Sequence, residues 1–170
     1  MKIFIPKMYQ KNVFNINYDL LKKKKIKMLI FDLDNTIVKA IKEVPENNIK
    51  KLIDDLKKDF KVVVASNNYQ KRVKKVCDYL ECDYLSFIMK PTLRIKRKIK
   101  KKYSYQMREI CIIGDQLVTD IFVGNRCGIY TILVDPLSDE ELKITSFNRF
   151  FEKIIKKKLD FKEGVYYEEE

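Results

Sequence analysis

The sequence predicts an α/β protein with a doubly wound, mostly parallel sheet. Short apolar runs rich in Val and Ile alternate along the chain with amphipathic stretches. These runs are continuous, which is typical of parallel strands that are buried on both faces. An alternation of strands and helices gives right-handed βαβ units. Together these observations indicate a Rossmann-like core.

The length and composition favour one domain. A chain of 170 residues suits a single core, which we expect over residues 1–163, with an acidic, disordered tail at 164–170. No segment approaches the roughly 20 apolar residues that span a bilayer, and the N-terminus lacks the apolar core of a signal peptide. We expect a cytoplasmic protein, and peripheral contact with a membrane stays open.

Five strands are expected at the apolar runs 27–32, 61–65, 84–88, 109–113 and 129–134. Val62-Val63-Val64-Ala65 and Ile110-Cys111-Ile112-Ile113 are bounded by polar residues, as buried strands are. The residues before the first run show no clear period, and we expect them to wrap the edge of the sheet.

Helices are expected between these strands. In 49–56 and 73–80, apolar residues recur at i, i+3, i+4 and i+7, which places them on one helical face. Pro45 suits the start of the first of these helices. Apolar residues in 117–122 indicate a further helix, and aromatic and aliphatic residues in 147–155 indicate a C-terminal one.

The chain has four cysteines, none in a CxxC pair, and no histidine. We expect reduced cysteines that pack in the core, and neither a zinc site nor a disulfide framework. The lack of histidine excludes Ser-His-Asp triads, Cys-His pairs and HExxH zinc sites. Acid–base chemistry must therefore come from Asp, Glu, Lys, Tyr or Cys.

Asp32 and Asp34 directly follow the first apolar run, in Phe31-Asp32-Leu33-Asp34-Asn35-Thr36. Alternate residues of a strand point the same way, so the two carboxylates should share one side. Because burying charge is costly, a Mg²⁺ ion between them would relieve the repulsion. A carboxylate can also be the nucleophile in phosphoryl transfer. By itself, the pair fits a solvated turn equally well.

Polar residues also follow the second and third strands, where ligands of open α/β sheets bind. Ser66 and Asn67 follow the second, near a helix start that could seat a phosphate or be a plain N-cap. Lys90 follows the third and could neutralise a phosphate and an aspartate together.

The fourth strand is followed by Gly114, Asp115 and Asp120. We expect Gly114 to let the backbone turn sharply, with Asp115 at the strand tip and Asp120 one helical turn further. A carboxylate opposite the Asp32–Asp34 pair would complete a magnesium site. Suitable groups after four strands favour one shared site over four unrelated turns.

These stretches resemble the motifs of the haloacid dehalogenase-like (HAD) phosphatase superfamily. The motifs are Phe31–Thr36, Ser66-Asn67-Asn68, Lys90-Pro91 and Gly114–Asp120, in the order of the family. The residues of these motifs are most similar to those of the YqeG-type branch of subclass IIIA, which is related to the mitochondrial phosphatidylglycerophosphate phosphatases.

The resemblance implies a phosphatase that works through an aspartyl-phosphate. Asp32 would be the nucleophile, and Asp34 the general acid and then the base that activates water. Ser66 would donate a hydrogen bond to the phosphoryl group, with Asn67 beside it among the substrate-binding residues. Lys90 would steady the phosphoryl charge.

The resemblance also implies a Mg²⁺ cofactor. Asp32, Asp115 and the main-chain carbonyl of Asp34 would coordinate the ion, and Asp120 would support this shell. Each of these positions carries the residue that the family's motif has there, so the resemblance implies an active enzyme.

A HAD-like core without a cap domain is expected. Ser66 follows Asp34 by 32 residues and Lys90 follows Ser66 by 24, which is room only for the helices and strands of the core. The site should therefore be open. A small metabolite could not be sealed from water there, whereas a macromolecule or a lipid headgroup could cover the site itself.

The formal net charge of +12 is concentrated in runs such as Lys22–Lys27 and Arg94–Lys102. Such a surface attracts nucleic acid, anionic lipid or phosphorylated metabolites, although an AT-rich coding sequence would give the same composition. We expect a phosphorylated substrate, with phosphatidylglycerophosphate as one candidate. The alternatives are an RNA- or ribosome-binding module with a vestigial site, and a phosphotransferase.

Overall fold

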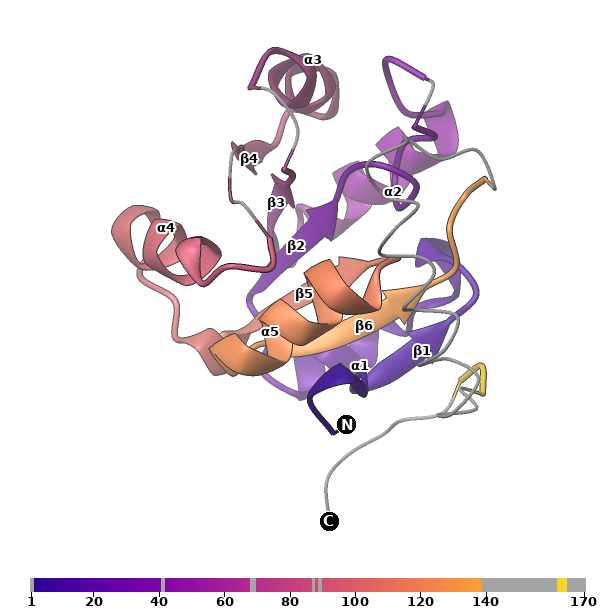
Figure 1. The fold of residues 1–170 in the computed structure, drawn as a ribbon. Coiled ribbons are helices and arrows are strands. Elements are labelled where there is room, and N and C mark those ends of the chain that lie inside the picture. Colours follow the sequence, from indigo (N-terminus) through magenta and orange to yellow (C-terminus); the bar gives the residue numbers. More distant parts are fainter. Residues whose placement is uncertain are drawn as a thin grey trace.

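The computed structural model describes residues 2–40, 42–67, 70–86, 88, 90–138 and 162–164. A six-stranded sheet forms its centre, with the strand order β1-β6-β5-β2-β3-β4 and every neighbouring pair parallel (Figure 1). The strands are β1 (Met8–Gln10), β2 (Met28–Asp32), β3 (Lys61–Ala65), β4 (Asp83–Leu85), β5 (Ile110–Gly114) and β6 (Tyr130–Val134).

Within the described residues, five α-helices connect and cover the strands: α1 (Tyr18–Lys23), α2 (Asn47–Leu56), α3 (Gln70–Leu80), α4 (Arg94–Lys102) and α5 (Phe122–Cys127). A π-helical turn, Leu117–Ile121, leads into α5. Short 3-10 turns lie at Lys2–Phe4, Val13–Asn15 and Met107–Glu109. The helix expected at 147–155 and nearly all of the acidic tail fall outside the described residues.

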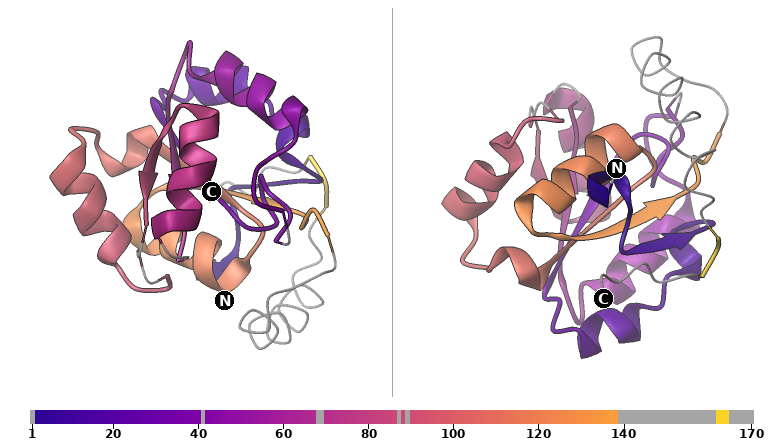
Figure 2. Two further views of the ribbon diagram at one scale, coloured as in Figure 1. Left: turned by 90° about the horizontal axis from the view of Figure 1, so that it is seen from above. Right: turned by 60° about the horizontal axis from the view of Figure 1, so that its bottom comes forward.

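Both faces of the sheet are buried, which explains the continuous apolar runs. Leu29 and Phe31 of β2 pack in one core with α1, α2 and α3, whereas Met28 and Ile30 pack in the other with α4 and α5. Figure 2 shows the two groups of helices around the sheet. The predicted doubly wound fold is confirmed.

The sequence-based expectation differs from the structure mainly at the edges of the sheet. The third strand is Asp83–Leu85 and ends before Ile88, the last residue of the expected run. The N-terminal segment does lie at the sheet edge, but it contributes the strand β1, which pairs with β6. Three residues, Met-Tyr-Gln, are too few to show a period of two.

The winding of the sheet reverses between β2 and β5. From β2 the chain adds β3 and β4 on one side, and β5 and β6 then pair on the other side. Ligands of such sheets bind beyond the carboxyl ends of the strands at this switch point. The next residues after β2 and β5 therefore face the expected ligand position.

The connections around the switch point hold only elements of the core. Between Asp34 and Ser66, the described residues hold only α2, β3 and their connections, and between Ser66 and Lys90 only α3 and β4. No helix among the described residues is long and apolar enough to cross a membrane. The four cysteines are free thiols, and three of them are buried.

Candidate active site

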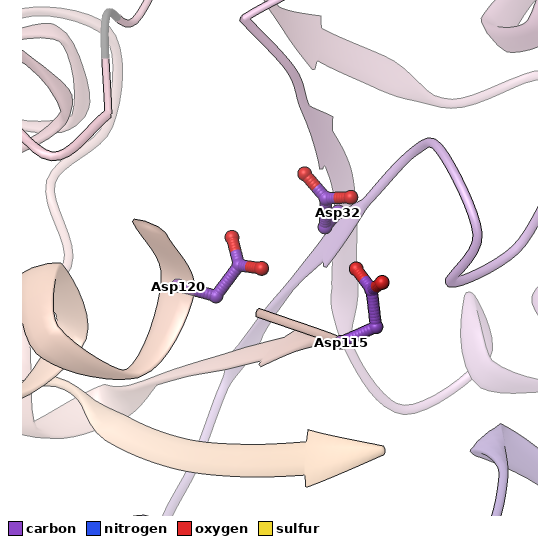
Figure 3. A group of neighbouring side chains, drawn as sticks. All are labelled: Asp32, Asp115 and Asp120. Carbon is purple, nitrogen blue, oxygen red and sulfur yellow. The ribbon is translucent and has the colours of Figure 1, made fainter. Parts of the chain in front are cut away.

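Three carboxylates meet beyond the ends of β2 and β5. Asp32 is the last residue of β2, Asp115 follows β5, and Asp120 lies in the π-helical turn. One oxygen of each lies within 4.8 Å of those of the others, and Figure 3 shows the side chains turned toward one region. Asp115 and Asp120 are fully buried, and the Asp32 side chain is 12% exposed.

Lys90 brings a positive charge into this carboxylate cluster. Its Nζ lies 2.5 Å from Asp32 Oδ1 and 2.5 Å from Asp120 Oδ1, and its side chain is 2% exposed. Burial by itself would lower the pKa of Lys90, but the charges of Asp120 and Asp32 outweigh burial and raise the pKa above its ordinary value. Lys90 is therefore an ammonium at neutral pH.

With all three carboxylates ionised, the cluster would carry an excess of negative charge, since three carboxylates face one ammonium. Burial raises the pKa of Asp32 well above its ordinary value; Lys90 opposes this shift, and Asp120 and Asp115 add to it. A divalent cation would relieve the excess, and Mg²⁺ prefers such oxygen ligands. The donor set of Asp32, Asp115 and Asp120 thus fits Mg²⁺.

Gly114 makes room for Asp120. A Cβ at position 114 would lie 2.3 Å from Asp120 Cγ and 2.3 Å from its Oδ2, which no real contact allows. The glycine does not adopt a left-handed conformation, so the sharp turn expected from the sequence is not its role. The Asp120 carboxylate is held in this space by the backbone N–H of Gln116, which donates to Oδ2 at 3.2 Å.

The loop after β2 is fixed by Asn35 and Thr36. Asn35 has the left-handed φ of 61° that Asn tolerates, and its Oδ1 accepts hydrogen bonds from Ala40 N and Ser138 Oγ. The Thr36 hydroxyl donates to Asp115 Oδ1 at 3.2 Å. Thr36 thereby ties the loop after β2 to the carboxylate after β5.

Asp34 follows Asp32 by two residues, and its carboxylate is paired with Arg72. Arg72 Nη2 is 2.7 Å and Nε 3.2 Å from Asp34 Oδ1. The side chain of Asp34 is therefore not part of the group of three carboxylates. Sequence reasoning missed Arg72, because one arginine in a strongly basic chain gives no signal until the fold brings it to Asp34.

Ser66 and Asn67 directly follow β3, and Asn67 contacts the Lys90 backbone. Ser66 is buried, and its backbone N–H donates to Leu85 O at 3.1 Å. The Asn67 amide accepts from Lys90 N at 2.7 Å and donates to Lys90 O at 3.0 Å. Asn67, which the sequence suggested for substrate binding, thus holds the backbone of the buried lysine.

Comparisons with known proteins agree with this architecture. A family model described as haloacid dehalogenase-like hydrolase matches residues 29–90, and one described as HAD-hydrolase-like matches residues 88–139. The fold is similar to a HAD family enzyme from Bacteroides thetaiotaomicron in a magnesium complex, with a TM-score of 0.53 and 16% identity over 68% of this chain and 96% of that one. An uncharacterized protein from Listeria monocytogenes serotype 4b gives a TM-score of 0.52 at 20% identity, over 69% and 85% of the two chains.

Two curated relatives are similar in sequence. The chain is 26% identical over 147 residues to phosphatidylglycerophosphate phosphatase 1 of Arabidopsis thaliana, covering 81% of this chain but 42% of that protein. It is 33% identical over 169 residues to the probable phosphatase YqeG of Bacillus subtilis, covering 99% of this chain and 98% of that one. The chain therefore belongs to the HAD-like hydrolases, in the branch of the YqeG-type phosphatases.

Proposed function

We propose that the protein is a Mg²⁺-dependent phosphatase that hydrolyses a phosphomonoester through an aspartyl-phosphate on Asp32. The observation that carries the proposal is the cluster of three buried or nearly buried carboxylates around one ammonium at the switch point of the sheet. Three carboxylates packed this closely are costly to keep ionised unless a cation binds between them.

The proposed reaction has two steps. An oxygen of Asp32 attacks phosphorus, so that a new P–O bond forms while the bond to the leaving oxygen breaks, and Asp34 gives that oxygen a proton. Water then attacks the phosphoryl group, Asp34 takes up the proton of the water, and inorganic phosphate leaves with the Asp32 carboxylate restored. Each step uses a carboxylate in a role that carboxylates commonly play.

The surrounding residues would hold the charges in place. Mg²⁺ bound by Asp32, Asp115 and the carbonyl of Asp34, with Asp120 in support, would neutralise phosphoryl oxygens. Lys90, already held at Asp32, would add its positive charge to the same oxygens. Ser66 would donate a hydrogen bond to the phosphoryl group from the end of β3.

Replacement of Asp32 by Asn tests the proposal. We expect Asp32→Asn to abolish the release of inorganic phosphate from phosphomonoesters while the circular dichroism spectrum stays native. Asp78→Asn, an exposed change on α3, should keep full activity, and EDTA should remove the activity of the unmodified protein. Turnover by Asp32→Asn would contradict the proposal.

For the substrate, we propose a large anionic phosphomonoester such as the headgroup of phosphatidylglycerophosphate. Three facts support it: the described connections around the site, which hold only core elements, the similarity to the Arabidopsis phosphatase named above, and the basic surface of α4. This helix has no acidic residue, and it exposes Arg94, Arg97, Lys100, Lys101 and Lys102. Basic residues near an anionic membrane contribute roughly 1 kcal/mol each.

A screen of phosphorylated compounds, with Mg²⁺ present and lipids included, would identify the substrate. The lipid proposal also requires binding to anionic vesicles; a protein that ignores such vesicles would contradict it without affecting the phosphatase proposal. If the protein binds RNA with a steep salt dependence, independently of Mg²⁺ and Asp32, the basic surface serves nucleic acid instead. Product analysis with added acceptors separates hydrolysis from phosphotransfer.

A further inference from the structure

Arg72 connects helix α3 to the loop that follows the first catalytic motif. Besides the two hydrogen bonds to Asp34 Oδ1, its Nη1 donates to Lys42 O at 2.9 Å and its Nη2 donates to Ala40 O at 3.2 Å. All three nitrogens of the guanidinium are thus engaged, and the side chain is 23% exposed. The carboxylate of Asp34 is similarly sheltered, at 21% exposure.

These contacts fix the direction of the Asp34 carboxylate. A guanidinium is planar and rigid, so two carbonyls that hold one side of it determine where its remaining N–H groups point. Those N–H groups hold one oxygen of Asp34. The orientation of the Asp34 carboxylate therefore follows from that of the guanidinium. A lysine could not do the same, because a single ammonium cannot reach a carboxylate and two separate carbonyls with a fixed geometry.

We propose that Arg72 is a positioning residue, which aims Asp34 at the oxygen of the leaving group. The inference rests on the proposed function and extends it to a residue outside the motifs of the sequence. Arg72 acts through Asp34, since four of its five N–H groups already donate within the protein. Misplacing a catalytic group by about 1 Å can cost roughly 100-fold in rate.

The leaving group gives a readout specific to this role. An alkoxide leaves poorly without a proton, so an alkyl phosphomonoester depends strongly on Asp34. A nitrophenolate is a stable anion and needs little help. Loss of Arg72 should therefore impair the two substrates unequally, whereas loss of fold or of phosphate binding would impair both alike.

The experiment compares Arg72→Gln with the unmodified protein on glycerol phosphate and on p-nitrophenyl phosphate, with Mg²⁺ present. We expect kcat/KM to fall about 100-fold for the alkyl ester and less than about 10-fold for the aryl ester. Lys75→Gln is the matched control. Lys75 lies on the same helix and forms an ion pair with Glu43 of the same loop, without contact to Asp34.

Two further variants keep the test decisive. Arg72→Lys retains the charge and should show the same unequal loss of kcat/KM on the two substrates. It therefore tests the proposal even if Arg72→Gln folds poorly. In an Asp34→Asn background, Arg72→Gln should cost less than about threefold. Equal losses on both substrates, or an undiminished loss in that background, would overturn the role of Arg72. If the unmodified protein released no phosphate in the presence of Mg²⁺, the proposed function itself would be overturned.

Discussion

Lys90 is the residue on which the electrostatics of the carboxylate cluster depend. Its ammonium touches Asp32 and Asp120, and its own backbone is held on both sides by the amide of Asn67. A buried charge is tolerated only when its partners are in place. The lysine thus has a structural role as well as the proposed catalytic one.

Lys90→Met should lower the stability of the protein in EDTA. Removing one member of a buried charge cluster leaves the others uncompensated, and we expect the free energy of unfolding to fall by about 3 to 5 kcal/mol. Urea denaturation measures this change. Lys100→Met, on the exposed side of α4, is the control and should change stability little. If Lys90→Met changed the free energy of unfolding as little as Lys100→Met does, the carboxylates would not need the Lys90 ammonium.

Gly114→Ala should impair the cluster more than the fold. The new methyl group would displace Asp120, so we expect weaker Mg²⁺ binding and a loss of activity of at least about 10-fold. Gly128→Ala is the contrasting variant, since position 128 has a φ of 73° and open space around it. It should lose stability without a change in Mg²⁺ affinity, as measured by calorimetry. Unchanged affinity in Gly114→Ala would contradict the steric argument.

At the residue scale, the sequence predicted the groups that stand directly after strands, because strand alternation and the switch-point rule place them. Asp115 directly after β5 and Asp32 at the end of β2 are of this kind, whereas Lys90 lies five residues beyond the end of β4. The partners Arg72 and Thr36 were not predicted, since their contacts join segments distant in the chain. The local sequence pattern predicts where residues at strand ends lie. Contacts between loops can be identified only once the fold is known.

At the scale of elements, the close approach of α5 to the sheet depends on Gly124. A Cβ there would lie 2.4 Å from Thr131 Cγ2 and 2.6 Å from Ile112 Cγ2. We expect Gly124→Ala to lower the free energy of unfolding by about 1 to 3 kcal/mol through overpacking. Adding Thr131→Ser, which removes one of the two methyl groups, should restore part of the loss in urea denaturation. Strictly additive effects would contradict a direct clash.

Element types were predicted well where burial is strong. The central strands carry apolar residues to both cores, so β2, β3, β5 and β6 are recognisable as continuous runs. The edge strands were less predictable. β4 is short, and β1 has only three residues, whose pairing with β6 is set by the assembled sheet and not by their own pattern.

At the scale of the whole molecule, Mg²⁺ should stabilise the fold. An ion that binds only the folded chain raises the free energy of unfolding by about 2.7 kcal/mol when its concentration is about 100 times Kd. Thermal unfolding with and without MgCl₂ measures this. Asp115→Asn should remove most of the shift, and Asp78→Asn should keep it. An equal shift in both variants would place the ion elsewhere.

The two glycines at positions 114 and 128 hold a lesson for redesign of this chain. A designer who chose residues from backbone torsions alone would keep glycine at 128 and freely replace it at 114. Position 128 would in fact admit Asn, whereas position 114 is blocked by a side chain from six residues further on. In a library of variants at position 114, selection for activity would therefore also be selection for the position of the Asp120 carboxylate.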